Sequence, residues 1–478
     1  MNERKIEDAI GFIDDELIEN ALSFNKKSAK REPFFTKLKN YKKLTRVAVA
    51  ALLVLSITLG IFLTSGMGVM RSFAVSLPDY PVMPQRAVMG IAAEKSEAWR
   101  EARSKQFQYY KDVGESLNSF YAKTISEYLG SQNGDNAIYS PTSAYLALAM
   151  LAECTNGSVK SELLSLLGVS SESLAETSEA LWLSTYWDDG KTTTKLASSL
   201  WLDKDYEYDE RITELLAEKY YASSFRGKFG TSSYNKALEA WLKKETGGLL
   251  KTDGIGFNPE TILAIATSVY FEASWESEFT KAENGTYLFK SNNGSTSSDF
   301  LKITNQGVYY WGDKFSATKK EFRDGGGAMY FILPDEGISP EELMADSEAV
   351  EFISNGGKTE NAVGIKVHLA VPRFDVETRA DLSEMLSALG LNSLFAPTGD
   401  YAILGDDALA YVSKIIHDAR VAIDEEGCIA AAYTVIVTDA TSAAPPESEV
   451  YFTVDRPFIF MITSSVGAPI FVGIVNNI

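Results

Sequence analysis

Histidine and cysteine, two side chains that often act as the base and the nucleophile in catalysis, are scarce in this 478-residue chain. The chain has two histidines, His368 and His417, and two cysteines, Cys154 and Cys428. It contains no GxSxG, HExxH or P-loop motif. Two histidines leave few bases for a serine hydrolase and argue against a histidine-rich metal site. We therefore expect no enzyme, no metal and no cofactor.

The chemistry that the sequence does offer is that of a cleavable loop. An acidic run and Gly427 lead into residues 428–438, which include no charge and no proline. Such a run favours a β-strand. It is followed by Pro445 and Pro446, which cannot continue a sheet ladder. The segment is therefore strand-competent but tethered as a loop, with an ordinary buried strand as the alternative.

Periodic patterns place this segment near the end of a mixed domain. Apolar residues recur at helical spacing in 143–168 and again in 212–221. Strand patterns bounded by turn signals follow, at 264–271, 328–333, 364–374, 409–424 and 450–462. This order predicts an α+β fold and leaves its topology open.

Eight motifs follow one another along residues 105–478. They are NAIYSPTSAYLALAMLAE at 136–153, WLKKETGGLL at 241–250, SVYFEASWESEF at 268–279, MYFILPDEG at 329–337, VPRF at 371–374, a helix with Leu382, Leu386, Leu389 and Gly390, YVSKIIHDARVAIDEEG at 411–427 and DRPFIFMITSSVGAPIFVGIVNN at 455–477. In type and order they resemble the motifs of the serpin family of serine protease inhibitors. One such match is weak, whereas eight in order are specific. The resemblance implies the serpin fold, with three β-sheets, eight to nine helices and an exposed reactive-centre loop.

The resemblance also implies how the loop works. A serine protease cuts the loop and forms an acyl ester, and insertion of the loop into the central sheet then carries the protease away and distorts its catalytic site. The implied hinge comprises Glu425, Glu426, Gly427, Cys428, Ala430, Ala431 and Ala432. If the register follows the family, the inward positions are Cys428, Ala430, Ala432, Thr434 and Ile436. All five are small or uncharged, which favours an inhibitor.

The expected cleavage site follows from the spacing of the family. Counting forward from Gly427 places the cut between Thr441 and Ser442, whereas counting back from the two prolines places it between Ser442 and Ala443. We prefer the first, because hinge length is the tighter geometric constraint. Both put a small uncharged residue before the cut, which fits a shallow specificity pocket. The expected partners are elastase-like or subtilisin-like serine proteases.

His417 matches the family's histidine beneath the central sheet. The resemblance implies that it bonds with Ser140 and Ser143 and helps to control sheet opening. The alternative is a buried structural histidine that hydrogen-bonds to a neighbouring strand, and the two interpretations nearly coincide.

The chain departs from the family pattern near the hinge. Thr267 replaces a usual asparagine, Ala273 a common glycine, and Cys428 and Ile429 replace Thr or Ser and Glu. The last pair keeps open a non-inhibitory serpin that acts as a substrate, carrier or binding module. Cys154 and Cys428 are expected as inert thiols, although a disulfide would lock the hinge if both lay near the top of the sheet.

The N-terminal region predicts a membrane anchor. Residues 47–70 are 24 residues without a charge, and about 20 suffice to cross a bilayer as a helix. Residues 26–46 include nine Lys or Arg against one acid, so the N-terminus is expected in the cytoplasm. We predict a cytoplasmic segment at 1–46, a transmembrane helix at 47–70, a stalk at 71–104 and an extracellular serpin domain at 105–478. A cleaved signal peptide is the alternative.

The charge and the topology limit the partners. A formal net charge of −20 argues against nucleic acid, since phosphate binding needs a basic surface. We expect a monomer of the bacterial type, anchored in the cell membrane. A membrane-anchored sensor, which reports cleavage of the external domain through the cytoplasmic segment, is a further hypothesis.

Overall fold

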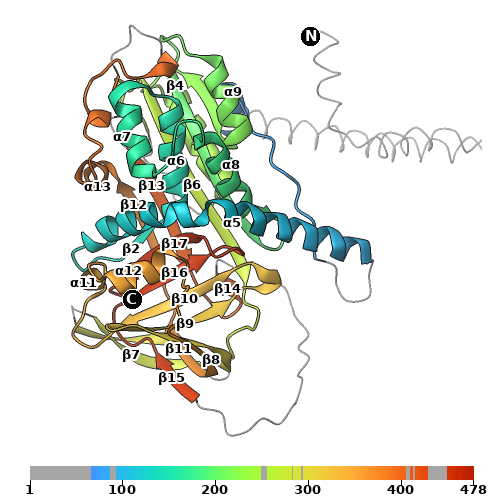
Figure 1. Cartoon of the computed structure of the whole chain (residues 1–478), viewed down its shortest axis with the longest axis vertical. Helices are drawn as coiled ribbons and strands as arrows, with labels where there is room; N and C mark the ends of the chain where they lie inside the picture. The colour runs from blue at the N-terminus through green and yellow to red at the C-terminus, as the bar shows by residue number, and fades with distance from the viewer. Residues whose placement is uncertain are drawn as a thin grey trace, which may run out of the picture. The chain divides into compact units, whose positions relative to one another are not determined.

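The structure is a computed structural model. It describes residues 66–86, 93–248, 256–281, 284–291, 294–404, 410–412, 415–428 and 449–478. The described residues lie in one compact unit, which runs from Gly66 to Ile478 (Figure 1). Outside them lie the expected cytoplasmic segment, most of the expected membrane span and residues 429–448. The latter include Ala430, Ala431 and Ala432 of the hinge and the expected cleavage site at Thr441 and Ser442.

The first sheet joins strands from distant parts of the chain. Its order is β1-β5-β4-β6-β13-β12, with β3 beside β4 and β14 beside β6. The strands are β1 Ala74–Ser76, β3 Trp187–Asp188, β4 Thr193–Asp203, β5 Ser223–Gly227, β6 Leu263–Ser274, β12 Asp375–Asp381, β13 Ile416–Ala422 and β14 Gly427–Cys428. β6 and β13 are parallel neighbours, and both become central to the site described below.

The second sheet has the order β15-β11-β8-β9-β10-β16-β17-β2, with β7 beside β8. Its strands are β2 Ala137–Tyr139, β7 Gly285–Ser291, β8 Gly294–Trp311, β9 Phe315–Glu321, β10 Ala328–Pro334, β11 Ala362–Pro372, β15 Glu449–Thr453, β16 Phe458–Thr463 and β17 Pro469–Val475. Three sheets were expected, and the described strands form two hydrogen-bonded networks. The reason is β8, which has 18 residues and pairs with β7 and β11 as well as with β9.

Ten α-helices lie in the described part of the chain, against eight to nine expected. They are α4 Gly66–Arg71, α5 Ala93–Gly130, α6 Pro141–Glu153, α7 Gly157–Leu167, α8 Leu174–Thr185, α9 Glu210–Lys219, α10 Ser232–Glu245, α11 Pro340–Leu343, α12 Ser347–Ser354 and α13 Ser383–Ala388. Three short 3-10 helices add Arg323–Gly325, Ser393–Phe395 and Ala402–Leu404. α5 crosses the unit between the helices α6–α9 and the second sheet (Figure 1).

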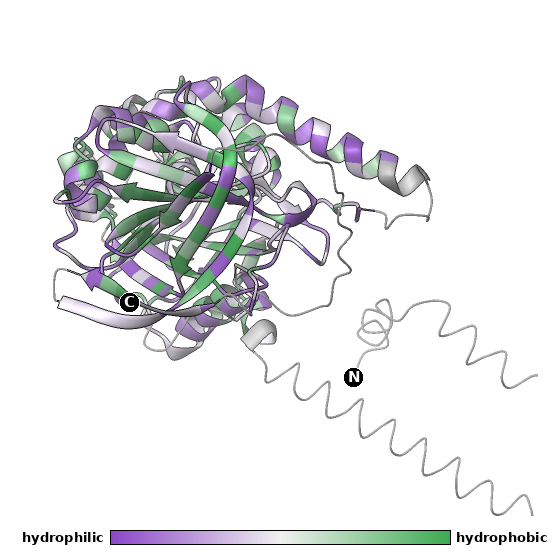
Figure 2. Ribbon diagram, turned by 90° about the horizontal axis from the view of Figure 1, so that it is seen from below, coloured by the Kyte–Doolittle hydropathy of each residue, from purple (hydrophilic) through white to green (hydrophobic). Residues whose placement is uncertain are grey.

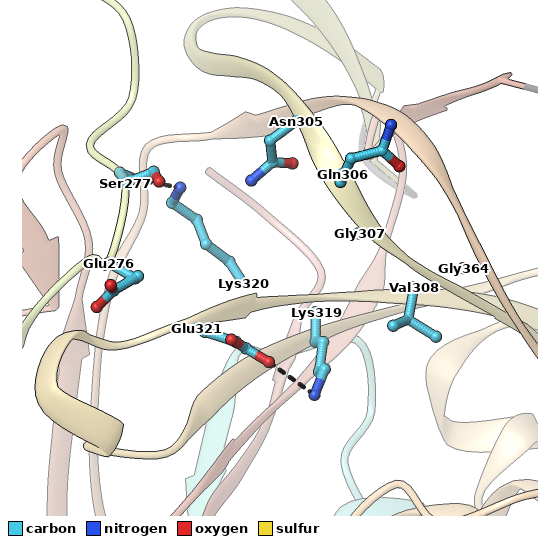
Figure 3. A pocket seen from close by; sticks show the side chains of 10 residues that line it. All are labelled: Glu276, Ser277, Asn305, Gln306, Gly307, Val308, Lys319, Lys320, Glu321 and Gly364. Carbon is cyan, nitrogen blue, oxygen red and sulfur yellow. Dashed lines mark hydrogen bonds and ion pairs between the residues drawn. The ribbon is translucent and has the colours of Figure 1, made fainter. Parts of the chain in front are cut away.

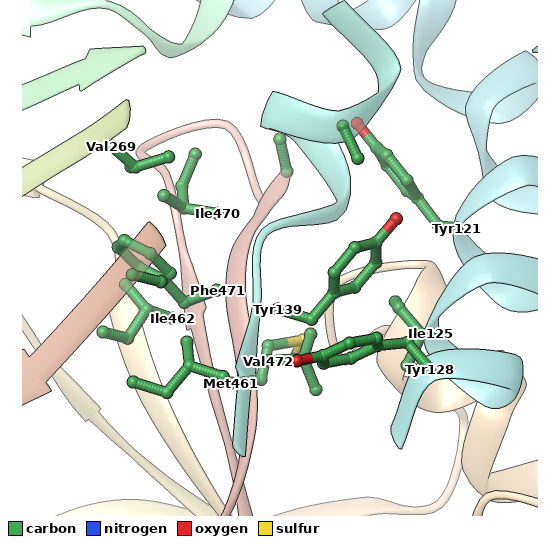
Figure 4. Close-up of a cluster of buried hydrophobic side chains, with 14 of the residues drawn as sticks. Tyr121, Ile125, Tyr128, Tyr139, Val269, Met461, Ile462, Ile470, Phe471 and Val472 are labelled. Atoms are coloured by element: carbon green, nitrogen blue, oxygen red, sulfur yellow. The ribbon is translucent and has the colours of Figure 1, made fainter. Parts of the chain in front are cut away.

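The main core lies where α5 packs on the second sheet. Figure 4 shows Tyr121, Ile125 and Tyr128 facing Tyr139 of β2 and the side chains of β16 and β17. Every residue of β16 and β17 is buried, and strands buried on both faces read as continuous apolar runs. α5 instead alternates hydrophilic and hydrophobic residues along its length (Figure 2). This core fixes the second sheet as a rigid support.

Residues 66–86, here called the N-terminal strap, pack against the domain instead of forming the expected stalk. Met70 of α4 is buried in a cluster with Trp201 and Trp241. β1 then pairs with β5, with Ala74 opposite Phe225. The compact unit therefore begins well before the predicted domain boundary at residue 105.

The second half of the strap crosses α8 and reaches the second sheet. The ring of Tyr80 stacks on Trp182 at 5.5 Å, and the Lys195 ammonium lies 4.6 Å from its centre. Arg86 forms an ion pair with Asp324 at 2.7 Å. The strap thus joins β5, α8 and the turn between β9 and β10.

The predicted membrane span has a mixed outcome. Residues 66–70 belong to α4, and residues 47–65 lie outside the described residues. In the part of the chain that the structure describes, no helix has both the length and the apolar character to span a bilayer.

Candidate functional site

The hinge begins as a tight turn at the end of β13. The Asp424 carboxylate accepts hydrogen bonds from the backbone N–H of Glu426 at 2.8 Å and of Gly427 at 3.0 Å. The Asp424 N–H donates in turn to the Gly427 carbonyl at 3.0 Å. An aspartate that bonds the backbone two and three residues on is a common turn device. The acidic run of the sequence therefore reverses the chain.

After the turn, the hinge enters the first sheet as β14. Gly427 lies opposite Ser274 and Cys428 opposite Ala273, both antiparallel to β6. Cys428 also bridges to Ile423 just beyond β13. A Cβ on Gly427 would lie 2.5 Å from the Ala273 carbonyl oxygen, so only glycine fits there. Gly427 and Cys428 of the hinge therefore already lie between β6 and the end of β13.

Trp275 and Phe279, which follow β6, donate hydrogen bonds to the backbone of the turn. The Trp275 backbone N–H donates to the Glu426 carbonyl and its indole N–H to the Asp424 carbonyl, both at 2.9 Å. The Phe279 N–H donates to the Glu425 carbonyl at 2.9 Å. Three backbone carbonyls of the turn are therefore bonded by one segment that follows β6.

An ion pair fixes the acidic end of the hinge. The Arg373 guanidinium pairs with the Glu425 carboxylate, which also accepts from the side chain of Asn284 at 3.0 Å. Partial burial works in the opposite direction, but the backbone hydrogen bond and Arg373 hold the pKa of Glu425 below its ordinary value. Arg373 is part of a matched motif, but its partner lies 52 residues further along the chain, and the sequence pattern does not reveal this pairing.

The two cysteines are both free and lie at opposite ends of β6. Cys428 faces Ala273 near the end of β6, whereas Cys154 follows directly after α6, which packs on Leu263 and Ile265 at the beginning of β6. Ten residues of strand span roughly 33 Å, and a disulfide needs Cα atoms within about 7 Å. The two thiols therefore do not pair. Burial raises the pKa of both, which keeps them inert.

A gap in the ladder separates β6 from β13 below the hinge. In the described residues the two strands pair only from Ile416–Ala266 to Asp418–Ser268. The next inward side chains on either strand, Val269 and Ala419, are buried. The gap between the hinge and this short ladder thus has an apolar floor.

The hinge and the ladder share one register. Cys428 lies opposite residue 273 on one side and 423 on the other, a difference of 150. The β6–β13 ladder joins residue 266 to 416, again a difference of 150. A strand that continues from Cys428 therefore stays in register with both neighbours.

His417 closes the lower end of the gap. The backbone N–H of Ser140 donates to its Nε2 at 3.1 Å, and the N–H of Ser143 donates to the Ser140 hydroxyl at 3.3 Å. Ser140 caps the N-terminus of α6 by this bond. Burial lowers the pKa of His417 to about 4, so the ring is neutral at pH 7 and its Nε2 accepts the hydrogen bond from the Ser140 N–H. Thr267, one of the departures from the family pattern, lies directly opposite His417.

The site therefore brings together residues that the sequence placed far apart. Glu425, Glu426, Gly427 and Cys428 sit at the upper end of the gap, and Ser140, Ser143 and His417 at the lower end. The support from Phe279 and Asn284 could not be predicted from the sequence, since neither residue type signals such a role.

Comparison with known proteins agrees with this arrangement. A family model described as "Serpin (serine protease inhibitor)" matches residues 115–478. An uncharacterized serpin-like protein of Thermococcus kodakarensis is 27% identical over 382 residues, covering 77% of this chain and 86% of that protein. Leukocyte elastase inhibitor A of Rattus norvegicus is 28% identical over 364 residues, covering 73% of this chain and 94% of that protein.

A solved structure has the same architecture. The thermophilic serpin tengpin, in its native state, superposes with a TM-score of 0.68 at 26% identity, covering 76% of this chain and 94% of that chain. The family match spans well over half of the sequence and includes both ends of the gap. The chain therefore belongs to the serpin family of serine protease inhibitors.

Proposed function

We propose that this serpin is a suicide inhibitor of serine proteases, cleaved between Thr441 and Ser442. The observation that carries the proposal is the shared register of Cys428 with β6 and β13. A loop whose first residues already pair with one flanking strand needs only to continue along it. The protein acts once, without catalytic turnover.

The register defines the inserted strand. Residues 428–438 would run antiparallel along 273–263 of β6. Thr434 would then lie between Thr267 and His417, and its neighbours would replace the other two ladder pairs. Insertion must therefore part β6 from β13 by one strand spacing, about 4.8 Å. The hydrogen bond between Ser140 and His417, here called the shutter contact, resists this movement.

The side chains of the loop suit that path. Ala430 would meet Phe271, and Ala432 would meet Val269, on the buried face of the sheet. Alanine fills such positions without displacing the core, whereas a charge there would be buried without a partner. The hinge composition thus permits insertion.

The energy of insertion is large enough to trap a protease. Eleven residues that form ladder bonds at about 0.5–1.5 kcal/mol each gain on the order of 10 kcal/mol. Whole domains are stable by roughly 5–15 kcal/mol. Distortion of the catalytic site of an attached protease is therefore within reach.

The small residue before the cut selects the target. Thr441 fits the shallow pocket of elastase-like or subtilisin-like proteases and leaves the aspartate of a trypsin pocket unpaired. One relative, at 28% identity, is named for the inhibition of a leukocyte elastase. We take elastase-like enzymes as the first targets to test.

We also propose that the protein is held on the cell membrane, with a cytoplasmic N-terminus and an extracellular inhibitor domain. Residues 47–65 alone carry no charge and would span about 28 Å as a helix, close to the hydrocarbon thickness of a bilayer. The nine basic residues before them set the orientation. Accessibility of each side to an added protease in intact cells tests this topology.

The test of inhibition uses the full chain in detergent. It is incubated with an elastase-type serine protease, and the mixture is run on a denaturing gel. We expect a band at the summed mass and a C-terminal fragment that begins at Ser442. Cleavage without that band would mean a protease substrate, and the non-inhibitory alternative would replace the proposal.

A further inference from the structure

Lys320 of β9 has a buried side-chain amine that forms no ion pair with any described residue. Its side chain is 4% exposed, and its ammonium donates to the Ser277 carbonyl. The ammonium lies 4.4 Å from the ring centre of Phe279 and 5.5 Å from that of Trp275. Among the described residues, none offers Lys320 a carboxylate within ion-pair distance. One carbonyl hydrogen bond and two aromatic rings compensate the charge of the ammonium only in part.

An unpaired buried ammonium is unfavourable. Buried charges in proteins are normally paired with an opposite charge. Burial lowers the pKa of Lys320 to about 7, so the charged form is much less favoured than in an exposed lysine. A bound anion would supply the missing partner and favour the charged form.

A cavity of about 390 Å³ lies beside this lysine. Lys320 forms part of its wall, together with Asn305, Gln306 and Ser277. Figure 3 shows the Lys320 amine ending between Ser277 and the side-chain amide of Asn305. An anion in the cavity would therefore meet the ammonium and could accept from an amide as well.

The rim limits what can enter. Glu276 is exposed at the mouth, and Glu321 is paired with Lys319 at 3.0 Å. These carboxylates disfavour an anion of high charge. Gly364 has open space where a side chain would be, and the stems of the two lysines are apolar. A small molecule with one negative charge and a narrow apolar chain fits this lining.

We propose that this cavity is a binding site for a small organic monocarboxylate, whose carboxylate pairs with Lys320 and hydrogen-bonds with Asn305. The site is independent of protease inhibition. It adjoins the hinge, because Trp275 and Phe279 contact Lys320 and also bond the backbone of the hinge turn.

Calorimetric titration of the full chain with hexanoate tests the site. We expect binding with one molecule per chain at pH 6, weakened at least tenfold at pH 8.5 as Lys320 loses its proton. Lys320→Met should abolish binding, because it keeps the apolar stem and removes the charge. Lys314→Met, at a lysine outside the cavity lining, is the control and should retain binding. Hexan-1-ol, which has the same body without the charge, should not bind.

Unchanged hexanoate binding in Lys320→Met, or equal binding of hexan-1-ol, would overturn the proposal. Lys320→Met removes an unpaired buried charge, so we expect it to fold. A second measurement needs no variant: in the chain labelled with ¹³C-lysine, the buried ε-carbon should titrate near pH 7, and hexanoate should move that midpoint upward. A midpoint that hexanoate leaves in place would also overturn it.

Discussion

Cys428 lies opposite Ala273 at the end of β6, with its side chain buried, so the predicted hinge enters the first sheet at this pair. The pairing fixes the direction and the register of the strand that follows. It also divides the loop into inward and outward positions, counted from Cys428. The first prediction follows from this division.

If the protein is the inhibitor that we propose, Ala432→Asp should convert it into a protease substrate. Position 432 is an even number of residues from Cys428 and would enter the buried face beside Val269 and Ala419. A buried carboxylate without a partner costs several kcal/mol, which is enough to slow insertion below the rate of deacylation. The number of inhibitor molecules consumed per trapped protease should rise at least tenfold.

Ala431→Asp is the matched control for that variant. Position 431 would face outward near Arg420, where a carboxylate remains solvated. Its stoichiometry of inhibition should stay within about twofold of the parent. Equal loss of trapping in both variants would contradict the register.

The pH dependence of stability should report on His417. Its pKa is about 4 in the folded chain and 6.5 in the unfolded chain, so the unfolded state binds more protons between these values. Stability is therefore full above about pH 6.5 and falls as the pH drops toward 4, by on the order of 3 kcal/mol. Protonation places a donor on Nε2 against the N–H of Ser140, which breaks the shutter contact.

His417→Gln should remove most of this dependence, since a glutamine carbonyl accepts the same hydrogen bond and does not titrate. Urea unfolding at pH 4.5 and 7.5 measures the difference. His368→Gln, which changes the other histidine on β11, serves as the control and should keep the slope of the parent. A slope that survives in His417→Gln would assign the effect to other groups.

The sequence predicted individual elements better than their junctions. Strands expected at 264–271 and 328–333 match β6 and β10 within three residues. The helix expected at 143–168 is instead two helices, because Gly157 adopts φ +54° and the Asp400 carboxylate bonds the N–H of Ser158. Asp400 lies more than 240 residues away, and local periodicity carries no trace of it.

The strand expected at 450–462 also divides. β15 ends at Thr453 and β16 begins at Phe458, on opposite sides of the second sheet. Asp455 and Pro457 lie between them, and proline ends a ladder because it has no N–H. The Pro457 signal was present in the sequence, yet the apolar residues on both sides masked it.

The site itself was predictable only in part. The acidic turn, Gly427 and His417 carry a pattern that the family resemblance identifies. The pairing of Cys428 with Ala273 and the docking of the N-terminal strap depend on contacts over more than 100 residues. Charge-free runs such as 47–70 favour a membrane span by composition alone, and they do not reveal that Met70 packs against Trp241.

The strap should contribute to the stability of the folded domain. Tyr80→Ala removes a ring that stacks on Trp182 and lies beneath Lys195, which should cost about 3 kcal/mol of unfolding free energy. Val82 is 95% exposed, so Val82→Ala serves as the control and should change the free energy of unfolding by less than about 0.5 kcal/mol. Thermal unfolding of the full chain compares the two. Equal stability of both variants would show that the strap does not bear on folding.

The identity of the residue before the cut should decide the target. Thr441→Arg supplies a guanidinium for the aspartate of a trypsin pocket and a side chain too long for an elastase pocket. The second-order rate of trypsin inhibition should rise by at least 100-fold, and that of elastase should fall by a similar factor. Ser442→Arg is the control, because it places the same charge after the bond and should gain little against trypsin. A larger trypsin gain in Ser442→Arg would move the cleaved bond to Ser442–Ala443, which the count back from the two prolines favours, while the insertion mechanism would stand unchanged.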